Sequence, residues 1–343
     1  MNRNRIIAIA IGVIIIASVS GYYLYGSVIA PALLPKTRTV TDARGAQVTI
    51  PYEVKKVLTL REVHTEMCIV LGAEDKLVGI DDGTKANRSY GVMNVKLRPA
   101  IQSLPCPISG KSLNLEQIVA LKPDVIFIGG YGRLSWIDTL KPTNISVVVA
   151  HFEEIGNYTR DLKIMGEVLG KQDKANEIST HINSILSAVS SRVGNISQSQ
   201  KISAYFSGND LYHVYGSTTF EHFQIVTAGG TNVASSITTW LPAVSPEQLI
   251  SWNPNVIFTL ESVNKMSVLQ DPNVQTVSAI QNQKVFPIPQ GGWDFGSLRA
   301  IFAIEWLSTK LYPARWSDVN ITNAANTFYQ NVYKINYWGP SLA

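Results

Sequence analysis

The residues best suited to recognise a small molecule lie in loops that are expected to follow β-strands. They combine aromatic rings with a few arginines. Rings offer stacking and apolar contact, and guanidinium groups pair with anionic groups. In open α/β sheets, ligands bind beyond the carboxyl ends of the strands. These loops therefore predict a cleft for a large, partly anionic, ring-bearing solute. The candidate ligand-binding residues are Arg61, Tyr131, Tyr215, Trp240, Trp293, Asp294, Phe295 and Arg299.

The sequence contains no pattern typical of an enzyme. It lacks a nucleophile elbow, a zinc-ligand spacing and a Walker motif, and "GGYG" at residues 129–132 does not have the spacing of a dinucleotide-binding loop. A bare transition-metal ion would need three or four His, Asp or Glu ligands. His64, His213 and Asp294 could supply them, although no loop is rich in histidine. We expect no catalysis and no cofactor, and direct metal-ion binding remains the alternative function.

Composition narrows the class of protein. The 343 residues are 45% hydrophobic and 16% charged, which is typical of a globular chain with a sizeable core. The net charge of +4 is not concentrated in a Lys/Arg-rich run, so nothing indicates a nucleic-acid partner. Cys68 and Cys106 are too few for a disulfide framework. One bridge between them is possible, and two buried free thiols are the favoured alternative.

Residues 1–36 are expected to form a signal or membrane anchor. Arg3 and Arg5 precede an apolar run, and no further charged residue occurs before Lys36. Residues 6–19 suit the core of a cleaved signal, whereas residues 6–29 are long enough to span a membrane; we favour the uncleaved anchor. Both alternatives export the rest of the chain to the outer face of the cytoplasmic membrane. Five Asn-x-Ser/Thr triplets are then candidate glycosylation sites, starting at Asn87, Asn144, Asn157, Asn195 and Asn320.

An internal repeat relates the two halves of the exported part. The stretch "LNLEQIVALKPDVIFIGG" at residues 113–130 returns as "VSPEQLISWNPNVIFTLE" at residues 244–261. Glu116 corresponds to Glu247 and Pro123 to Pro254, with no gap between these anchors. Each copy predicts a short helix that a proline ends, followed by a buried strand. Two structurally similar lobes are the simplest explanation.

The elements around the repeat predict an α/β protein. A hairpin is expected near residues 39–51, because residues 42–45 ("DARG") form a turn signal between β-branched residues. Apolar runs bounded by glycines suit parallel strands that are covered on both faces, and they alternate with amphipathic helices. Residues 158–193 show no strand signal and predict a helical connector. The expected organisation is an anchor (1–36), a first lobe (37–156), a linking helical segment (157–194) and a second lobe (195–343).

These motifs, in this order, resemble the substrate-binding proteins of ABC importers for iron-siderophores, cobalamin and related metal chelates. The stretches that carry the resemblance are "VTDARGAQVTIP", "LGAEDKLVGID", the two repeat copies, "AGGTNVA" and "GGWDFGSLRAIFAIEWLSTKLYP", and it extends from about residue 39 to residue 313. The resemblance implies two Rossmann-like lobes joined by one long helix, the class III architecture, with the ligand held between the lobes. It is far more specific for the family than for the ligand.

The resemblance also implies a function and partners. The chain would capture a metal chelate (a ferric siderophore, cobalamin or haem) and deliver it to a permease dimer with its ATPase. In the family, one glutamate on each lobe docks against arginines of the permease. Those glutamates match Glu116 and Glu247 here. Alternatively, both carboxylates could simply complement the positive end of a helix dipole.

Overall fold

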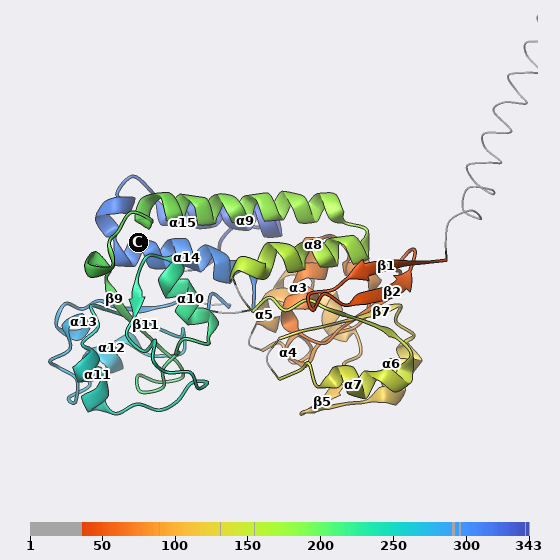
Figure 1. Ribbon diagram of the computed structural model, residues 1–343, viewed down its shortest axis with the longest axis horizontal. Coiled ribbons are helices and arrows are strands. Elements are labelled where there is room, and N and C mark those ends of the chain that lie inside the picture. Colours follow the sequence, from red (N-terminus) through yellow and green to blue (C-terminus); the bar gives the residue numbers. More distant parts are fainter. Residues whose placement is uncertain are drawn as a thin grey trace, which may run out of the picture.

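Two four-stranded parallel sheets, one in each half of the chain, form the framework of the molecule (Figure 1). The computed structural model describes residues 36–343 except Ser89, Tyr131, Glu154, Gln290, Gly291, Phe295, Pro340 and Ala343. The first sheet has the order β4-β3-β7-β8, and the second has the order β10-β9-β11-β12. The strands are β3 (Val57–Thr59), β4 (Leu77–Gly79), β7 (Val125–Ile128), β8 (Ser146–Val149), β9 (Ser203–Ser207), β10 (Thr231–Asn232), β11 (Val256–Thr259) and β12 (Val285–Pro287).

The internal repeat is visible as two copies of one unit. Helix α6 (Leu115–Leu121) is capped by Asn114, and helix α11 (Pro246–Trp252) is capped by Ser245; each cap accepts a hydrogen bond from a backbone N–H three residues on. Each helix ends at a left-handed residue directly before the repeated proline. The following strands, β7 and β11, are buried at every position, as their apolar sequences predict. Both strands occupy the same place in their sheets.

The remaining elements surround these sheets. Two antiparallel hairpins pair β1 (Thr37–Thr41) with β2 (Gln47–Pro51) and β5 (Ile108–Ser109) with β6 (Ser112–Leu113). The other α-helices are α3 (Glu62–Val70), α4 (Asp82–Lys85), α5 (Gly91–Leu97), α7 (Trp136–Leu140), α8 (Tyr158–Leu169), α9 (Gln172–Val193), α10 (Phe220–Thr227), α12 (Lys265–Leu269), α13 (Ser278–Gln281), α14 (Leu298–Leu311) and α15 (Ile321–Tyr333). Short 3₁₀ turns are η2 (Glu74–Lys76), η3 (Pro99–Ser103), η4 (Lys141–Thr143), η5 (Ile155–Asn157), η6 (Gln198–Gln200) and η7 (Pro313–Trp316).

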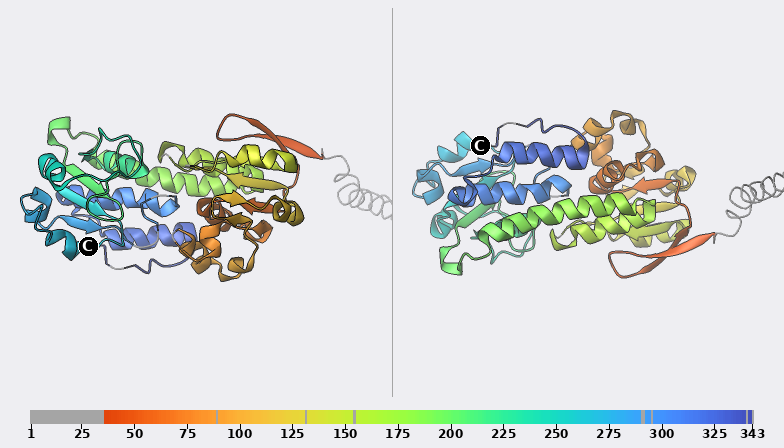
Figure 2. Two further views of the ribbon diagram at one scale, coloured as in Figure 1. Left: turned by 90° about the horizontal axis from the view of Figure 1, so that it is seen from below. Right: turned by 90° about the horizontal axis from the view of Figure 1, so that it is seen from above.

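Helix α9 runs along the long axis of the molecule and connects the two halves (Figure 2). Its 22 residues bury Ile178, Ile182, Ile185 and Val189, which recur at helical spacing on one face. That face packs against α8 on one side and α14 on the other. Helices α14 and α15 lie beside α9 (Figures 1 and 2). The linking segment is therefore one wall of a helical layer that spans both lobes.

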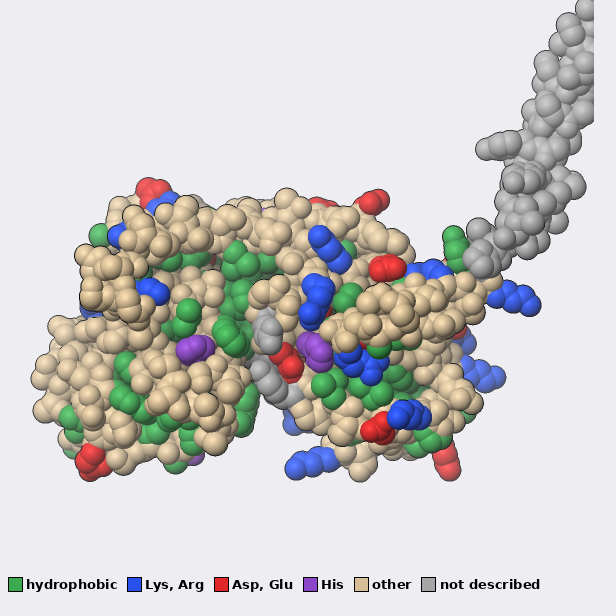
Figure 3. All heavy atoms as spheres, in the orientation of Figure 1, with side chains coloured by type: hydrophobic (Ala, Val, Ile, Leu, Met, Phe, Trp, Pro, Cys, Tyr) green, Lys and Arg blue, Asp and Glu red, His purple; other side chains and the backbone are tan. Residues whose placement is uncertain are grey.

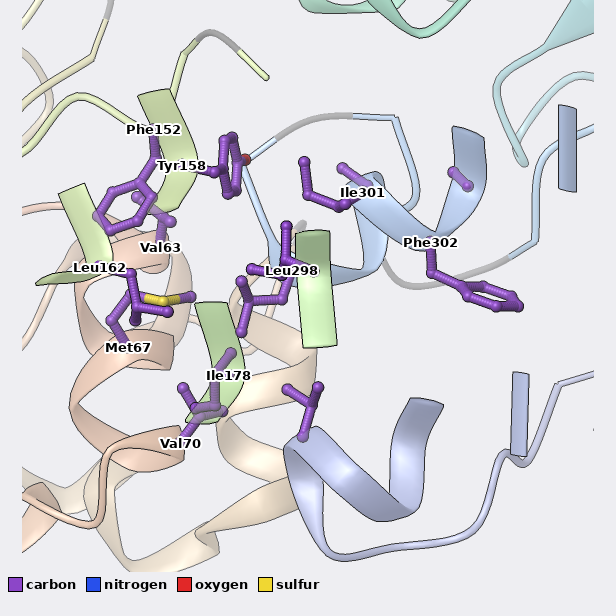
Figure 4. Close-up of a cluster of buried hydrophobic side chains, with 14 of the residues drawn as sticks. Val63, Met67, Val70, Phe152, Tyr158, Leu162, Ile178, Leu298, Ile301 and Phe302 are labelled. Atoms are coloured by element: carbon purple, nitrogen blue, oxygen red, sulfur yellow. The ribbon is translucent and has the colours of Figure 1, made fainter. Parts of the chain in front are cut away.

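One hydrophobic core extends through both halves of the chain. It contains residues of the first sheet, such as Phe127, and of the second sheet, such as Phe206 and Phe258. The helical layer joins them, because side chains of α3, α8, α9 and α14 converge in a single cluster (Figure 4). The lobes are thus packed into each other along the helical layer.

Three further sequence predictions concern the N-terminal anchor, the two cysteines and the boundaries of the lobes. The predicted anchor lies outside the described residues except for Lys36, and no helix within the described residues is long and apolar enough to cross a membrane. Cys68 and Cys106 are both free thiols; Cys68 is buried, and burial raises the pKa of its thiol, whereas Cys106 is only half-buried. Both sheets fall within the expected lobe segments, which we keep as the proposed boundaries of the lobes.

Candidate functional site

The carboxyl ends of the two sheets meet across a cleft. Figure 3 shows a notch between the two halves, on the side away from α9, which Figure 1 labels in the same orientation. The hydroxyl of Tyr90, which precedes α5 in the first lobe, donates to Asp294 Oδ2 of the second lobe over 2.9 Å. Asp294 follows β12, the strand next to β11. The two lobes therefore touch at the position where open α/β sheets bind ligands.

Arg61 is the best-placed cation on the first lobe. It lies two residues after the end of β3 and is the N-cap residue of α3, in an extended backbone conformation. Its side chain is 12% exposed, and its Nε lies 4.0 Å from Glu62 Oε2. The guanidinium lies against Gly130, where a Cβ atom would collide with Nη1. Gly130 also has a φ of +86°, so both its backbone conformation and its contact with Arg61 favour glycine.

Arg133 connects the loop that follows β3, which contains Arg61, to the loop that follows β4. One of its Nη atoms donates to the carbonyl of Leu60, and the other donates to Asp82 Oδ1 over 2.9 Å. The guanidinium also lies 5.0 Å from the ring centroid of Trp136. These contacts tie the ends of β3 and β4 together. Arg133 therefore acts as a positioning residue for the loop that contains Arg61.

His64 is an interior residue and not a ligand. Its ring is fully buried, and Nε2 lies 2.7 Å from the carbonyl oxygen of Ala150. Burial lowers the pKa of His64 to about 3, so the imidazole is neutral at physiological pH. His151 lies nearer to solvent, with Nδ1 3.9 Å from Glu153 Oε2.

On the second lobe, a buried carboxylic acid and two aromatic rings lie in the segments near Asp294. Glu221 in the first turn of α10 is buried, and its Oε2 has no hydrogen-bond partner within the described chain. Burial, together with the nearby Asp294, raises the pKa of Glu221 to about 8. Tyr215 is nearly buried and packs edge-on against Trp240, with ring centroids 5.9 Å apart. The side chain of Trp240 is 58% exposed.

Two predicted ligand contacts, Trp293 and Arg299, are interior residues instead. The indole of Trp293 is fully buried, donates to Tyr329 Oη over 3.1 Å, and packs edge-on against Phe302. Arg299 is also fully buried, and its Nη1 lies 3.0 Å from Glu66 Oε2. Because neither side chain has exposed surface, neither touches the cleft in this structure. Both residues were predicted to lie in the cleft because the sequence does not show that α15 covers their segment.

The rest of the predicted set divides into three groups. Arg61, Tyr215, Trp240 and Asp294 border or approach the cleft. Tyr131 and Phe295 lie outside the described residues. Of the candidate metal ligands, His213 pairs with Asp210 at 2.9 Å, away from His64. No group of three or more His, Cys, Asp or Glu side chains that could hold a metal ion occurs within the described part of the chain.

Sequence reasoning missed Glu66, Tyr90 and Glu221. For Glu66 a signal existed: it is a charged residue between Val63, Met67 and Val70 on the apolar face of α3. A carboxylate at such a position needs a buried partner. Tyr90 and Glu221 carried no comparable signal, since both stand in short, mixed segments.

The repeated glutamates are displayed alike on the two lobes. Glu116 and Glu247 are both exposed in the first turns of α6 and α11. The hydroxyl of Ser245 helps to hold the pKa of Glu247 below its ordinary value. Both carboxylates therefore occupy equivalent, exposed positions on the two lobes.

A profile of the periplasmic binding protein family matches residues 57–291, which include both sheets. The chain belongs to the periplasmic binding protein family. The resemblance found in the sequence and the predicted class III fold are both confirmed.

Individual relatives differ in what they bind. The chain is 27% identical to the molybdate-binding protein MolA of Haemophilus influenzae over 88% of its own length and 92% of the relative. The structure of MolA bound to molybdate superposes with a TM-score of 0.77, at 25% identity, over 88% of this chain and all of the other. A cobalamin-binding protein of Halobacterium salinarum is 24% identical over 72% of this chain and 65% of that protein. These relatives are solute-binding proteins, so the chain is a substrate-binding protein of the ABC-importer kind and not an enzyme.

Proposed function

We propose that the chain captures an anionic solute between its lobes, outside the cytoplasmic membrane, and delivers it to the permease of an ABC importer. The position of Arg61 is the observation that supports an anionic solute. Its guanidinium lies at the carboxyl edge of β3, against the glycine loop that follows β7. A partly buried guanidinium offers strong, bidentate hydrogen bonds to an oxyanion.

A compact oxyanion such as molybdate is the preferred solute. MolA, which binds molybdate, is similar to this chain over most of both lengths. The buried position of Trp293 also removes one of the large rings that a ring-bearing solute would need.

A metal chelate is the second candidate. The exposed Trp240 favours it, because an indole at the rim can cover a macrocycle or an aromatic chelator. The relatives that bind cobalamin point the same way. Direct binding of a bare metal ion has less support, since the described residues offer no cluster of metal ligands.

Arg61→Ala is expected to weaken molybdate binding roughly 10–100-fold, because a hydrogen bond to a charged group contributes about 1.5–3 kcal/mol. Calorimetric titration of the full chain with molybdate, tungstate, sulfate, a ferric siderophore and cobalamin measures the effect and selects the solute. Arg315→Ala is the matched control, because Arg315 is exposed and bonds Arg192 and Asn195 far from the cleft. Equal affinities in the two variants would contradict a role for Arg61.

Replacing Glu116 and Glu247 together with alanine is expected to abolish uptake while solute affinity stays unchanged. The reason is that each glutamate would meet an arginine of one permease subunit, whereas neither lies at the cleft. Uptake by cells or by vesicles with the permease, measured beside binding, tests this prediction. Glu53→Ala removes another exposed carboxylate and serves as control. If the two glutamates only complement helix dipoles, at about 0.3–1 kcal/mol each, uptake would persist.

A further inference from the structure

A second cavity lies along the free edge of the second sheet. It has a volume of about 400 Å³ and follows β12, the edge strand, from Val285 to Pro289. Trp306 and Lys310 of α14 form one wall, Lys265 at the start of α12 forms another, and Ser341 and Leu342 close one side. A cavity of this size, lined mainly by apolar side chains, can enclose a small molecule.

Two lysines point their amines over the same aromatic ring of this cavity. The Nζ of Lys265 lies 5.5 Å from the ring centroid of Phe286, and the Nζ of Lys310 lies 5.6 Å from it. Lys310 Nζ is also 5.7 Å from the Trp306 centroid and donates to the carbonyl of Leu342 over 2.8 Å. None of the ion pairs formed among the described residues involves Lys265 or Lys310, although Glu261 also lines the cavity.

An anion between the two amines would stabilise this arrangement. Burial lowers the pKa of Lys310, and the charge of Lys265 lowers it further. Lys265 also occupies the first position of α12, where the helix dipole disfavours a cation. Lysines and prolines do protect exposed sheet edges from pairing with other strands. That role accounts for one lysine above β12, but it requires neither a second lysine nor a cavity.

We propose that this cavity binds a small organic anion, namely a carboxylate attached to a planar apolar body. The carboxylate would lie between the amines of Lys265 and Lys310, and the body would lie over Phe286 and Trp306. Its lining shares no residue with Arg61, Trp240 or Asp294 of the cleft. The cavity is therefore a second ligand site on the same lobe, filled independently of the transported solute.

A ¹⁹F NMR titration of the full chain with 4-fluorobenzoate tests the proposal. Saturable binding is expected, weakened about tenfold or more by Lys265→Met or Lys310→Met and lost in the double variant. Methionine keeps an unbranched apolar stem of nearly the same length as that of lysine, so the fold should persist. Lys284→Met, which removes an exposed lysine just before β12, is expected to bind the probe as the parent does. Saturating molybdate is expected to leave the titration unchanged.

Two comparisons make the result decisive. Neutral 4-fluorobenzamide, of nearly the same shape, is expected to bind at least about tenfold more weakly, because it cannot pair with the amines. Reductive ¹³C-methylation of the lysines gives a second signal, and the resonance of Lys310 is expected to move on addition of the benzoate. The proposal is overturned if the benzoate does not bind, if the amide binds equally well, or if the double lysine variant binds like the parent.

Discussion

Replacing Arg299 with methionine is expected to lower the free energy of unfolding by about 3–5 kcal/mol, the usual cost of removing one partner from a buried ion pair. The variant would leave the Glu66 carboxylate in an interior with no cation beside it. Its remaining partners would be the hydroxyl of Tyr333, at 2.6 Å, and the backbone N–H of Leu298, at 3.2 Å. Urea denaturation of both proteins measures the difference.

The double variant Glu66→Gln/Arg299→Met separates the charge from the packing. It is expected to recover most of the lost stability, because an amide can still accept from Tyr333 and no buried charge remains. Arg192→Met is the matched control: Arg192 pairs with Asp318 at the surface, where such pairs contribute about 0–1 kcal/mol. If Arg299→Met costs no more than this control, the interior pair does not stabilise the contact between the lobes.

Replacing Glu221 with glutamine is expected to remove a large pH dependence of stability. In the folded chain the pKa of Glu221 is about 8, against an ordinary value of 4.5, so the folded state holds this proton more tightly. Its stabilising contribution is complete below pH 4.5 and is lost as the pH rises to 8. Each tenfold difference in proton affinity corresponds to about 1.4 kcal/mol, so the total is roughly 4–5 kcal/mol.

The sign of this effect can be checked by denaturation between pH 5 and pH 9. The parent protein should lose stability across this range, and the glutamine variant should lose less and become the more stable protein at pH 9. Burial also raises the pKa of Asp81 to about 6 and that of Glu305 to about 7, so part of the slope remains in both proteins. Tyr90 and Tyr215 also face Glu221, but burial holds the pKa of each hydroxyl above this range. Glu247→Gln, at an exposed carboxylate, should leave the parent slope unchanged. A parallel slope in the Glu221 variant would show that another group titrates.

The local signals in the sequence were sufficient for the framework. Asn114 and Ser245 are strong helix caps, the repeated prolines follow the helix ends, and "VIFI" and "VIFT" have the apolar composition of strands covered on both faces. These signals act over a few residues, so they can be read without knowing the rest of the fold. The repeat then supplied the relation between the lobes, and the position of Arg61 after β3 followed from the parallel sheet.

The interior of the contact between the lobes could not be predicted in the same way. Arg299 begins a helix and looks solvent-exposed in the sequence, but its partners are Glu66 and Tyr333, both more than 30 residues away. Trp293 is covered by Tyr329 from α15, a helix that the sequence analysis did not foresee. Burial of this kind depends on which helix finally lies above a segment. No periodicity in residues 290–300 contains that information.

The buried contacts of Glu66 couple the unfolding of one lobe to that of the other. A carboxylate on α3 holds residues of α14 and α15, and side chains of α3 and α14 occupy the same apolar cluster. If one lobe were to unravel alone, it would leave both a charge and an apolar face of the other in water. Domains that fold independently do not expose such buried groups when one of them unfolds, whereas these two lobes would. Despite its duplicated architecture, the described part of the chain should therefore behave as a single cooperative unit, melting in one transition and yielding no soluble half when cut.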